Sequence, residues 1–131
     1  MKICIAGGPQ VGKTTLGKEL TSLSRTEESY IQLRSTDALV LDLDWHEQSV
    51  FVLAWLDDVG PWVIEGVPVI RALRKWLRNH PEGKPCDTLY WRFAARTERS
   101  RGQERLAKGC LAVFTEIEPE LRRRGVEIRE F

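Results

Sequence analysis

The chain has 131 residues, of which 42% are hydrophobic and 30% are charged, and its net charge is +1. This balance is typical of one globular domain spanning residues 1–131 and excludes a disordered chain. The apolar runs are too short to cross a membrane, and the residues before Gly7 leave no room for a secretory signal, so we expect a cytoplasmic protein. The three cysteines form no C-x-x-C pair and indicate neither a disulfide framework nor a zinc site.

The charges are unevenly distributed along the chain. Residues 1–65 carry 5 Lys and Arg against 10 Asp and Glu, whereas residues 66–131 carry 15 against 9. A basic second half is suited to facing phosphate groups, and an acidic first half is suited to facing a metal ion or a hydroxyl group.

Glycine, proline and capping residues divide the chain into alternating strand-like and helix-like segments. The pattern predicts strands at residues 2–6, 30–33, 62–64, 88–93 and 126–128. Helices are expected from Lys13 onward, over 45–58, over 69–78 and over about 99–124, the last interrupted or restarted near Pro119. Asp44 and Glu47 have the spacing of a capping box. Strands alternating with helices predict a three-layer α/β fold with a five-stranded parallel sheet and ligands at the strands' carboxyl ends.

The segment Gly7–Thr14 matches the pattern G-x-x-x-x-G-K-[ST] at every fixed position. Glycines let the backbone N–H groups turn toward an anion, the lysine reaches the β- and γ-phosphates, and the Thr14 hydroxyl ligates Mg²⁺. A chance glycine-rich turn is the alternative, but the motif follows a predicted strand and opens a predicted helix, as its mechanism requires. The predicted nucleotide-binding residues are Gly7, Gly8, Gln10, Val11, Gly12, Lys13, Thr14 and Thr15.

With this motif in place, the chain resembles the small P-loop kinases, the group that includes adenylate kinase, gluconate kinase and the 5′-kinase domain of phage polynucleotide kinase. The resemblance follows the order of elements over most of the chain, and its one specific match is the phosphate loop. It implies a P-loop NTPase fold with strand order 2-3-1-4-5, ATP and Mg²⁺ as donor and cofactor, Lys13 as a catalytic cation, and a phage enzyme.

The same resemblance assigns roles to two acidic residues at predicted strand ends. Asp37 would accept the proton of the acceptor hydroxyl or bind the acceptor, and Glu65 would hold the Mg²⁺ shell together with Thr14 or serve as the base instead. An Asx turn leaving a strand is the structural alternative for Asp37. The segment 39–44 is a competing acidic strand end, although Asp44 is already explained as a helix cap.

Arginines that follow the fourth predicted strand occupy the place of the group's lid, which closes over the triphosphate. They are Arg96, Arg99, Arg101 and Arg105. Arginine is always charged and forks onto phosphate oxygens, so these side chains are candidates to neutralise the moving phosphoryl group. A solvated helix start is the alternative.

We expect the acceptor between Asp37 and the basic helix that carries Arg71 and Arg74. We expect the acceptor group to be a hydroxyl of a nucleoside, a nucleotide or a nucleic acid. The chain has little room for the helical insert that binds free mononucleotides, which favours a large acceptor such as a nucleic-acid end or an exposed base, including a hydroxymethylated pyrimidine in phage DNA. A P-loop ATPase or GTPase and a non-catalytic nucleotide-binding module remain as alternatives, although the guanine-reading tetrapeptide N-K-x-D is absent from the sequence.

Overall fold

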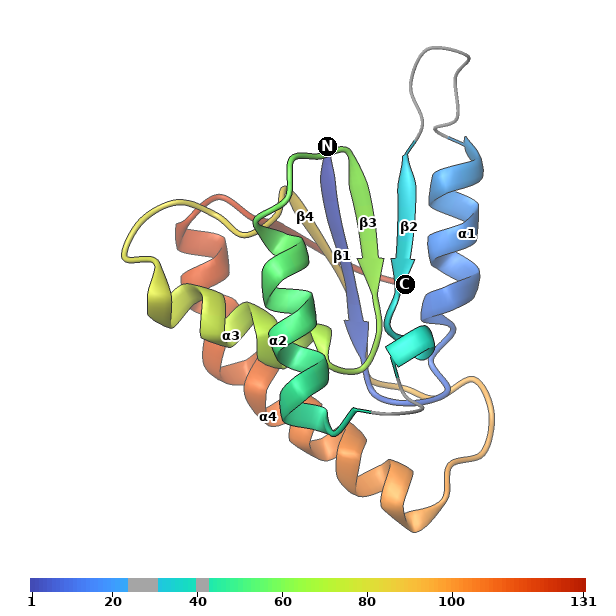
Figure 1. The fold of residues 1–131 in the computed structure, drawn as a ribbon. Coiled ribbons are helices and arrows are strands. Elements are labelled where there is room, and N and C mark those ends of the chain that lie inside the picture. The colour runs from blue at the N-terminus through green and yellow to red at the C-terminus, as the bar shows by residue number, and fades with distance from the viewer. Residues whose placement is uncertain (24–30, 40–42) are drawn as a thin grey trace.

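A computed structural model describes residues 1–23, 31–39 and 43–131 (Figure 1). In chain order the elements are β1 (Lys2–Gly7), α1 (Lys13–Leu23), β2 (Gln32–Ser35), a short 3-10 helix η1 (Thr36–Leu39), α2 (Trp45–Leu56), β3 (Trp62–Glu65), α3 (Val69–Asn79), β4 (Thr88–Arg92), α4 (Arg101–Arg123) and β5 (Glu127–Glu130). Within these ranges every helix is too short or too polar to span a bilayer.

The five strands form one parallel sheet in the order β2-β3-β1-β4-β5, as predicted. Helix α1 covers one face, and α2, α3 and α4 cover the other, which gives three layers (Figure 1). Side chains of β1 alternate between the two layers, since Ile3 and Ile5 pack with α1 whereas Cys4 and Ala6 pack with the other helices. A central strand buried on both faces is apolar throughout, which explains the run Ile3–Ala6.

Helix α4 is continuous, so the predicted interruption near Pro119 is wrong. A proline inside a helix removes the hydrogen bond to the carbonyl four residues earlier, here that of Thr115. Both residues lie on the exposed side of α4, where water can satisfy that carbonyl. On the opposite side Ile117 and Leu121 are buried in the larger core, and their packing holds the helix together across the proline.

Two predicted element boundaries differ from the structure in ways that affect the site. Strand β2 spans Gln32–Ser35 instead of 30–33, so η1 follows directly and carries Asp37. Helix α2 ends at Leu56 instead of residue 58. At its start, the N-cap residue Asp44 accepts a hydrogen bond of 2.8 Å at its carboxylate from the Glu47 N–H. The competing acidic strand end at 39–44 includes residues 40–42, which lie outside the described residues.

Gly66, directly after β3, is required by both backbone conformation and space. Its φ is +146°, and a Cβ added there would lie 1.8 Å from Oγ1 of the buried Thr36 in η1. The chain after β3 therefore passes against η1 with no room for a side chain, which fixes the position of η1 beside the sheet.

We expect Gly66→Ala to lower the free energy of unfolding by about 3 kcal/mol or more, because left-handed strain and overpacking add. Chemical denaturation measures this change. Gly125→Ala is the matched control, since Gly125 also has positive φ (+91°) but nothing within 4 Å of an added Cβ. Its cost should be limited to about 1–2 kcal/mol of backbone strain, without the overpacking. Equal losses in the two variants would show that the contact with Thr36 has no role.

Candidate functional site

The loop between β1 and α1 lies at the carboxyl edge of the sheet and is shaped by close backbone contacts. A Cβ added to Gly8 would lie 2.6 Å from the Cβ of Ala107 in α4, so the loop and that helix touch at this point. A Cβ added to Gly12, whose φ is +90°, would lie 2.9 Å from Nε of Arg96. The glycines thus let a helix and an arginine approach the loop backbone directly.

Lys13, the first residue of α1, has a side chain almost entirely buried against this loop. It is 8% exposed, and its ammonium donates a 2.6 Å hydrogen bond to the carbonyl of Gly8. Burial lowers the pKa of Lys13, and the nearby Glu65 carboxylate opposes that shift. The loop therefore encloses a cation whose present partners are one carbonyl and a neighbouring carboxylate.

A cavity of about 350 Å³ opens in front of the loop. Its volume is in the range of sites that hold small ligands. The lining consists of Pro9, Gln10, Val11, Gly12, Lys13, Thr14, Thr15, Asp37, Glu65 and Val67. The structure thus brings together most of the residues predicted for nucleotide binding and both predicted carboxylates, while Gly7 and Gly8 lie outside this lining.

Three oxygen-bearing side chains from different elements converge on one wall of the cavity. The Thr14 hydroxyl of α1 donates to Oε1 of Glu65 at 3.0 Å and lies 3.5 Å from Oδ2 of Asp37. The hydroxyl of Ser35, the last residue of β2, also donates to Oε1 of Glu65. Sequence reasoning missed Ser35. Its role follows from the parallel register of β2 and β3, which pairs Ser35 with Glu65 and which the sequence alone does not set.

Glu65 and Asp37 sit in contrasting surroundings. Glu65 is 1% exposed, and burial raises its pKa, although the hydroxyls of Ser35 and Thr14 and the charge of Lys13 favour the ionised form. Asp37 is exposed, on η1 at the rim of the cavity. One carboxylate is therefore buried and hydrogen-bonded, and the other is open to an incoming molecule.

These oxygens fit a hard divalent cation. Mg²⁺ prefers oxygen ligands and usually takes only one or two carboxylates from the protein, with water and substrate phosphates completing its shell. The hydroxyl of Thr14 and the carboxylates of Glu65 and Asp37 are such donors. Among the described residues no group of three or more His, Cys, Asp or Glu side chains could hold a metal by itself.

Two of the four candidate lid arginines contact the loop between β1 and α1. The backbone N–H of Arg96 donates to the Gln10 carbonyl at 2.7 Å, and its Nε donates to the Val11 carbonyl at 3.2 Å. Arg99, whose side chain is only 2% exposed, donates from Nε to the Pro9 carbonyl at 2.7 Å. Both guanidinium groups therefore lie against the carbonyls of the loop.

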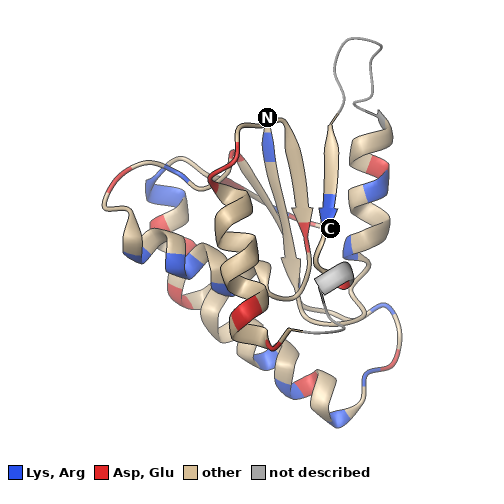
Figure 2. Ribbon diagram, in the orientation of Figure 1, with Lys and Arg blue, Asp and Glu red and all other residues tan. Residues whose placement is uncertain are grey.

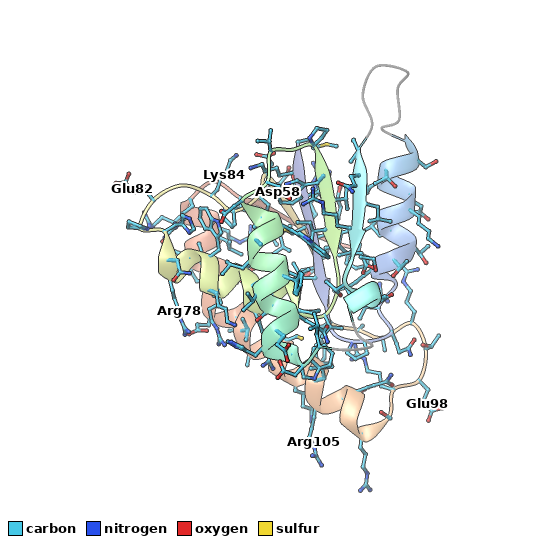
Figure 3. The ribbon with its side chains drawn as sticks, in the orientation of Figure 1. Asp58, Arg78, Glu82, Lys84, Glu98 and Arg105 are labelled. Carbon is cyan, nitrogen blue, oxygen red and sulfur yellow. The ribbon has the colours of Figure 1, made fainter. Side chains whose placement is uncertain are left out.

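The remaining predicted basic residues lie elsewhere. Arg101 and Arg105 are exposed at the start of α4, and Figure 3 shows Arg105 projecting away from the body of the protein. Arg74 pairs with Glu116 of α4 at 3.0 Å, and a Cβ added to Gly109 of α4 would lie 3.3 Å from Nη2 of Arg71. The two α3 arginines therefore lie at the contact between α3 and α4, outside the cavity lining.

We expect the buried carboxyl group of Glu65 to give the free energy of unfolding a distinct pH dependence. Because its pKa is raised in the folded protein, the stability it contributes is complete below its unfolded pKa and is lost as pH rises through the folded value. The difference in unfolding free energy between wild type and Glu65→Gln should therefore fall as pH rises above about 4.5, the ordinary value for a glutamate.

Chemical denaturation at several pH values measures this difference. The control is Glu19→Gln, which removes an exposed carboxylate on α1 and should leave the pH profile close to that of wild type. A wild-type stability that rises relative to Glu65→Gln over this pH range would contradict the prediction.

Comparison with known proteins adds no assignment to this geometry. No protein-family model matches the chain, and no curated protein matches it significantly. The case for a function therefore depends on the sequence motif, the fold and the cavity.

Proposed function

We propose that this chain is a P-loop phosphotransferase that uses ATP and Mg²⁺ and moves the γ-phosphoryl group to a hydroxyl of a nucleoside, a nucleotide or a nucleic acid. The observation that carries the proposal is the cavity itself. There the Lys13 ammonium, the Thr14 hydroxyl and the carboxylates of Glu65 and Asp37 converge beside a glycine-containing loop that leads into α1. The parallel sheet with order β2-β3-β1-β4-β5 supports it.

The loop and Lys13 are suited to holding the phosphates. Backbone N–H groups at the start of α1 favour an anion through hydrogen bonding and the helix dipole. Lys13 would exchange its bond with the Gly8 carbonyl for phosphate oxygens, a stronger charge-assisted interaction. Mg²⁺ would neutralise charge on the phosphates, held by Thr14 and by Glu65 directly or through water.

The contrast between the two carboxylates favours Asp37 as the proton acceptor. Glu65 is buried and already accepts hydrogen bonds from two hydroxyls, which suits it to orienting Thr14 and the metal shell. Asp37 is exposed at the cavity rim, where an acceptor hydroxyl can approach it. This separation of roles supports transfer to an acceptor, and a hydroxymethylated pyrimidine base is one acceptor of the right chemistry.

Arg96 and Arg99 are suited to stabilising the charge of the moving phosphoryl group. Their guanidinium groups lie beside the loop carbonyls of Val11 and Pro9. A positive charge placed there is worth several orders of magnitude in rate in phosphoryl transfer.

The buried, unpaired thiols of Cys4, Cys86 and Cys110 are compatible with the expected cytoplasmic location.

Lys13→Ala should abolish ATP binding or weaken it by about 2–5 kcal/mol, because the triphosphate would lose its buried cationic partner. The lower end of this range corresponds to a loss of affinity of roughly 30-fold. Isothermal titration calorimetry with Mg-ATP measures this loss. The matched control is Lys18→Ala, which removes an exposed lysine one turn further along α1. ATP binding by Lys13→Ala at wild-type affinity would exclude the loop as the phosphate site.

Asp37→Asn should bind ATP with near wild-type affinity but transfer phosphate about 10²–10⁴-fold more slowly, because the amide keeps the shape and loses the proton acceptor. Transfer of label from γ-labelled ATP to nucleosides, mononucleotides, oligonucleotide ends and hydroxymethylated DNA measures the rate. Glu65→Gln is the comparison. It should also lower the affinity for Mg²⁺, so that a higher Mg²⁺ concentration is needed for half-maximal transfer. Unchanged transfer by Asp37→Asn would move the base to Glu65, and label released only as free phosphate would favour an ATPase.

A further inference from the structure

A second hollow opens at the carboxyl edge of the sheet, between the first turns of α2 and α4. It is a groove of about 560 Å³ lined by Trp45, Ser100, Gly102, Gln103, Arg105 and Leu106. Figure 1 shows that both helices begin at this edge, the same edge that carries the phosphate loop. The roles proposed so far use none of the lining residues except Arg105, a lid candidate that does not reach the loop.

The groove contains an exposed aromatic ring at a fixed position. Trp45 is 42% exposed, whereas Trp62, Trp76 and Trp91 are at most 7% exposed. It is the first residue of α2, and the preceding Asp44 caps that helix, so its backbone is held in place. A flat, exposed indole in a groove is the kind of surface on which a nucleobase stacks.

The charges around this ring are suited to a polyanion. Within the described part of the chain, the groove lining includes Arg105 and no acidic side chain. Arg101, one turn earlier, is also exposed. Figure 2 shows basic residues interleaved with acidic ones along this end of α4, and acidic residues at the start of α2. Glu104, the acidic residue of the same turn, lies 3.9 Å from the Arg99 guanidinium and is partly neutralised by it. An aromatic platform next to exposed arginines is the usual composition of sites that bind single-stranded nucleic acid.

Helix α4 connects this groove to the phosphate cavity. Ala107 of α4 meets the phosphate loop at Gly8, and the adjacent Leu106 lines the groove. One turn of α4 therefore contacts the donor site and the groove at once. A strand lying in the groove would pass close to the cavity in which the phosphoryl group is proposed to move.

We propose that this groove binds single-stranded nucleic acid, with one base stacked on Trp45 and a neighbouring backbone phosphate on Arg105. The inference rests on the proposed phosphotransferase and narrows its acceptor to a polynucleotide. The groove lies between α2 and α4, apart from the α3 residues Arg71 and Arg74 that the sequence had suggested for the acceptor.

Fluorescence anisotropy with a labelled 12-nucleotide single-stranded DNA of mixed sequence tests the proposal. Trp45→Ala should weaken binding about 10-fold or more, and Trp45→Phe should retain most of the affinity because it keeps an aromatic face. Phe51→Ala is the matched control, since Phe51 is a 47% exposed aromatic on the same helix outside the groove lining. Losses in Trp45→Ala no larger than those in Phe51→Ala would overturn the proposal.

Salt dependence distinguishes the proposed phosphate contact of Arg105 from the proposed base stacking on Trp45. Arg105→Ala should reduce the slope of log K against log salt concentration by about 0.7, the value for one phosphate contact on a single strand. Arg122→Ala, at the far end of α4, should leave the slope unchanged. Quenching of tryptophan fluorescence by the oligonucleotide should also disappear in Trp45→Phe. A slope unaffected by Arg105→Ala, or quenching that persists in Trp45→Phe, would contradict the proposed contacts.

ATP affinity, measured separately by calorimetry, distinguishes failure of this inference from failure of the proposed function. If the protein binds no ATP but still binds the oligonucleotide through Trp45, the result would support the groove as a nucleic-acid site and exclude the phosphotransferase. If ATP binding is normal but phosphate is transferred only to free nucleosides, the result would support the phosphotransferase and overturn the groove as the site of a polynucleotide acceptor. Loss of ATP affinity in Trp45→Ala with unchanged oligonucleotide binding would assign the groove to the donor base and overturn the proposal.

Discussion

The arrangement of the whole site depends on one buried carboxylate at the end of a central strand. Glu65 ends β3, which lies between β2 and β1, and its Oε1 accepts hydrogen bonds from Ser35 at the end of β2 and from Thr14 in α1. Removing a carboxylate from water is unfavourable unless such donors surround it. The cluster therefore fixes two strand ends and the start of α1 relative to one another, and with them the wall of the cavity in front of the loop.

Much of the fold could be predicted because local chemistry and long-range packing agree. Alternating apolar strands and capped helices predicted a three-layer α/β fold around a parallel sheet. The observed strand order follows the prediction. The error at Pro119 shows where local reasoning fails. The backbone penalty of a proline is visible in the sequence, but the compensating burial of Ile117 and Leu121 against other elements is not.

The candidate site was predictable where it depends on a contiguous motif or a strand end. Lys13, Thr14, Asp37 and Glu65 line one cavity, as their positions in the chain suggested. Ser35 was missed because its role depends on the register between two strands. The division among the arginines was equally hidden, since Arg99 is buried against the loop while Arg101 is exposed only two residues later. Helical phase and loop path decide which of them turns inward, and neither is set by composition.

The contacts of Arg96 and Arg99 with the loop bear on how tightly an anion can be held. In the structure both side chains already donate hydrogen bonds to loop carbonyls, those of Val11 and Pro9. Arginine side chains have many rotamers, and ordering one costs up to about 2 kcal/mol of conformational entropy. Here part of that entropy is lost when the chain folds, so a phosphate of the proposed ligand would meet cations that are already ordered, and more of its interaction energy would be retained as affinity.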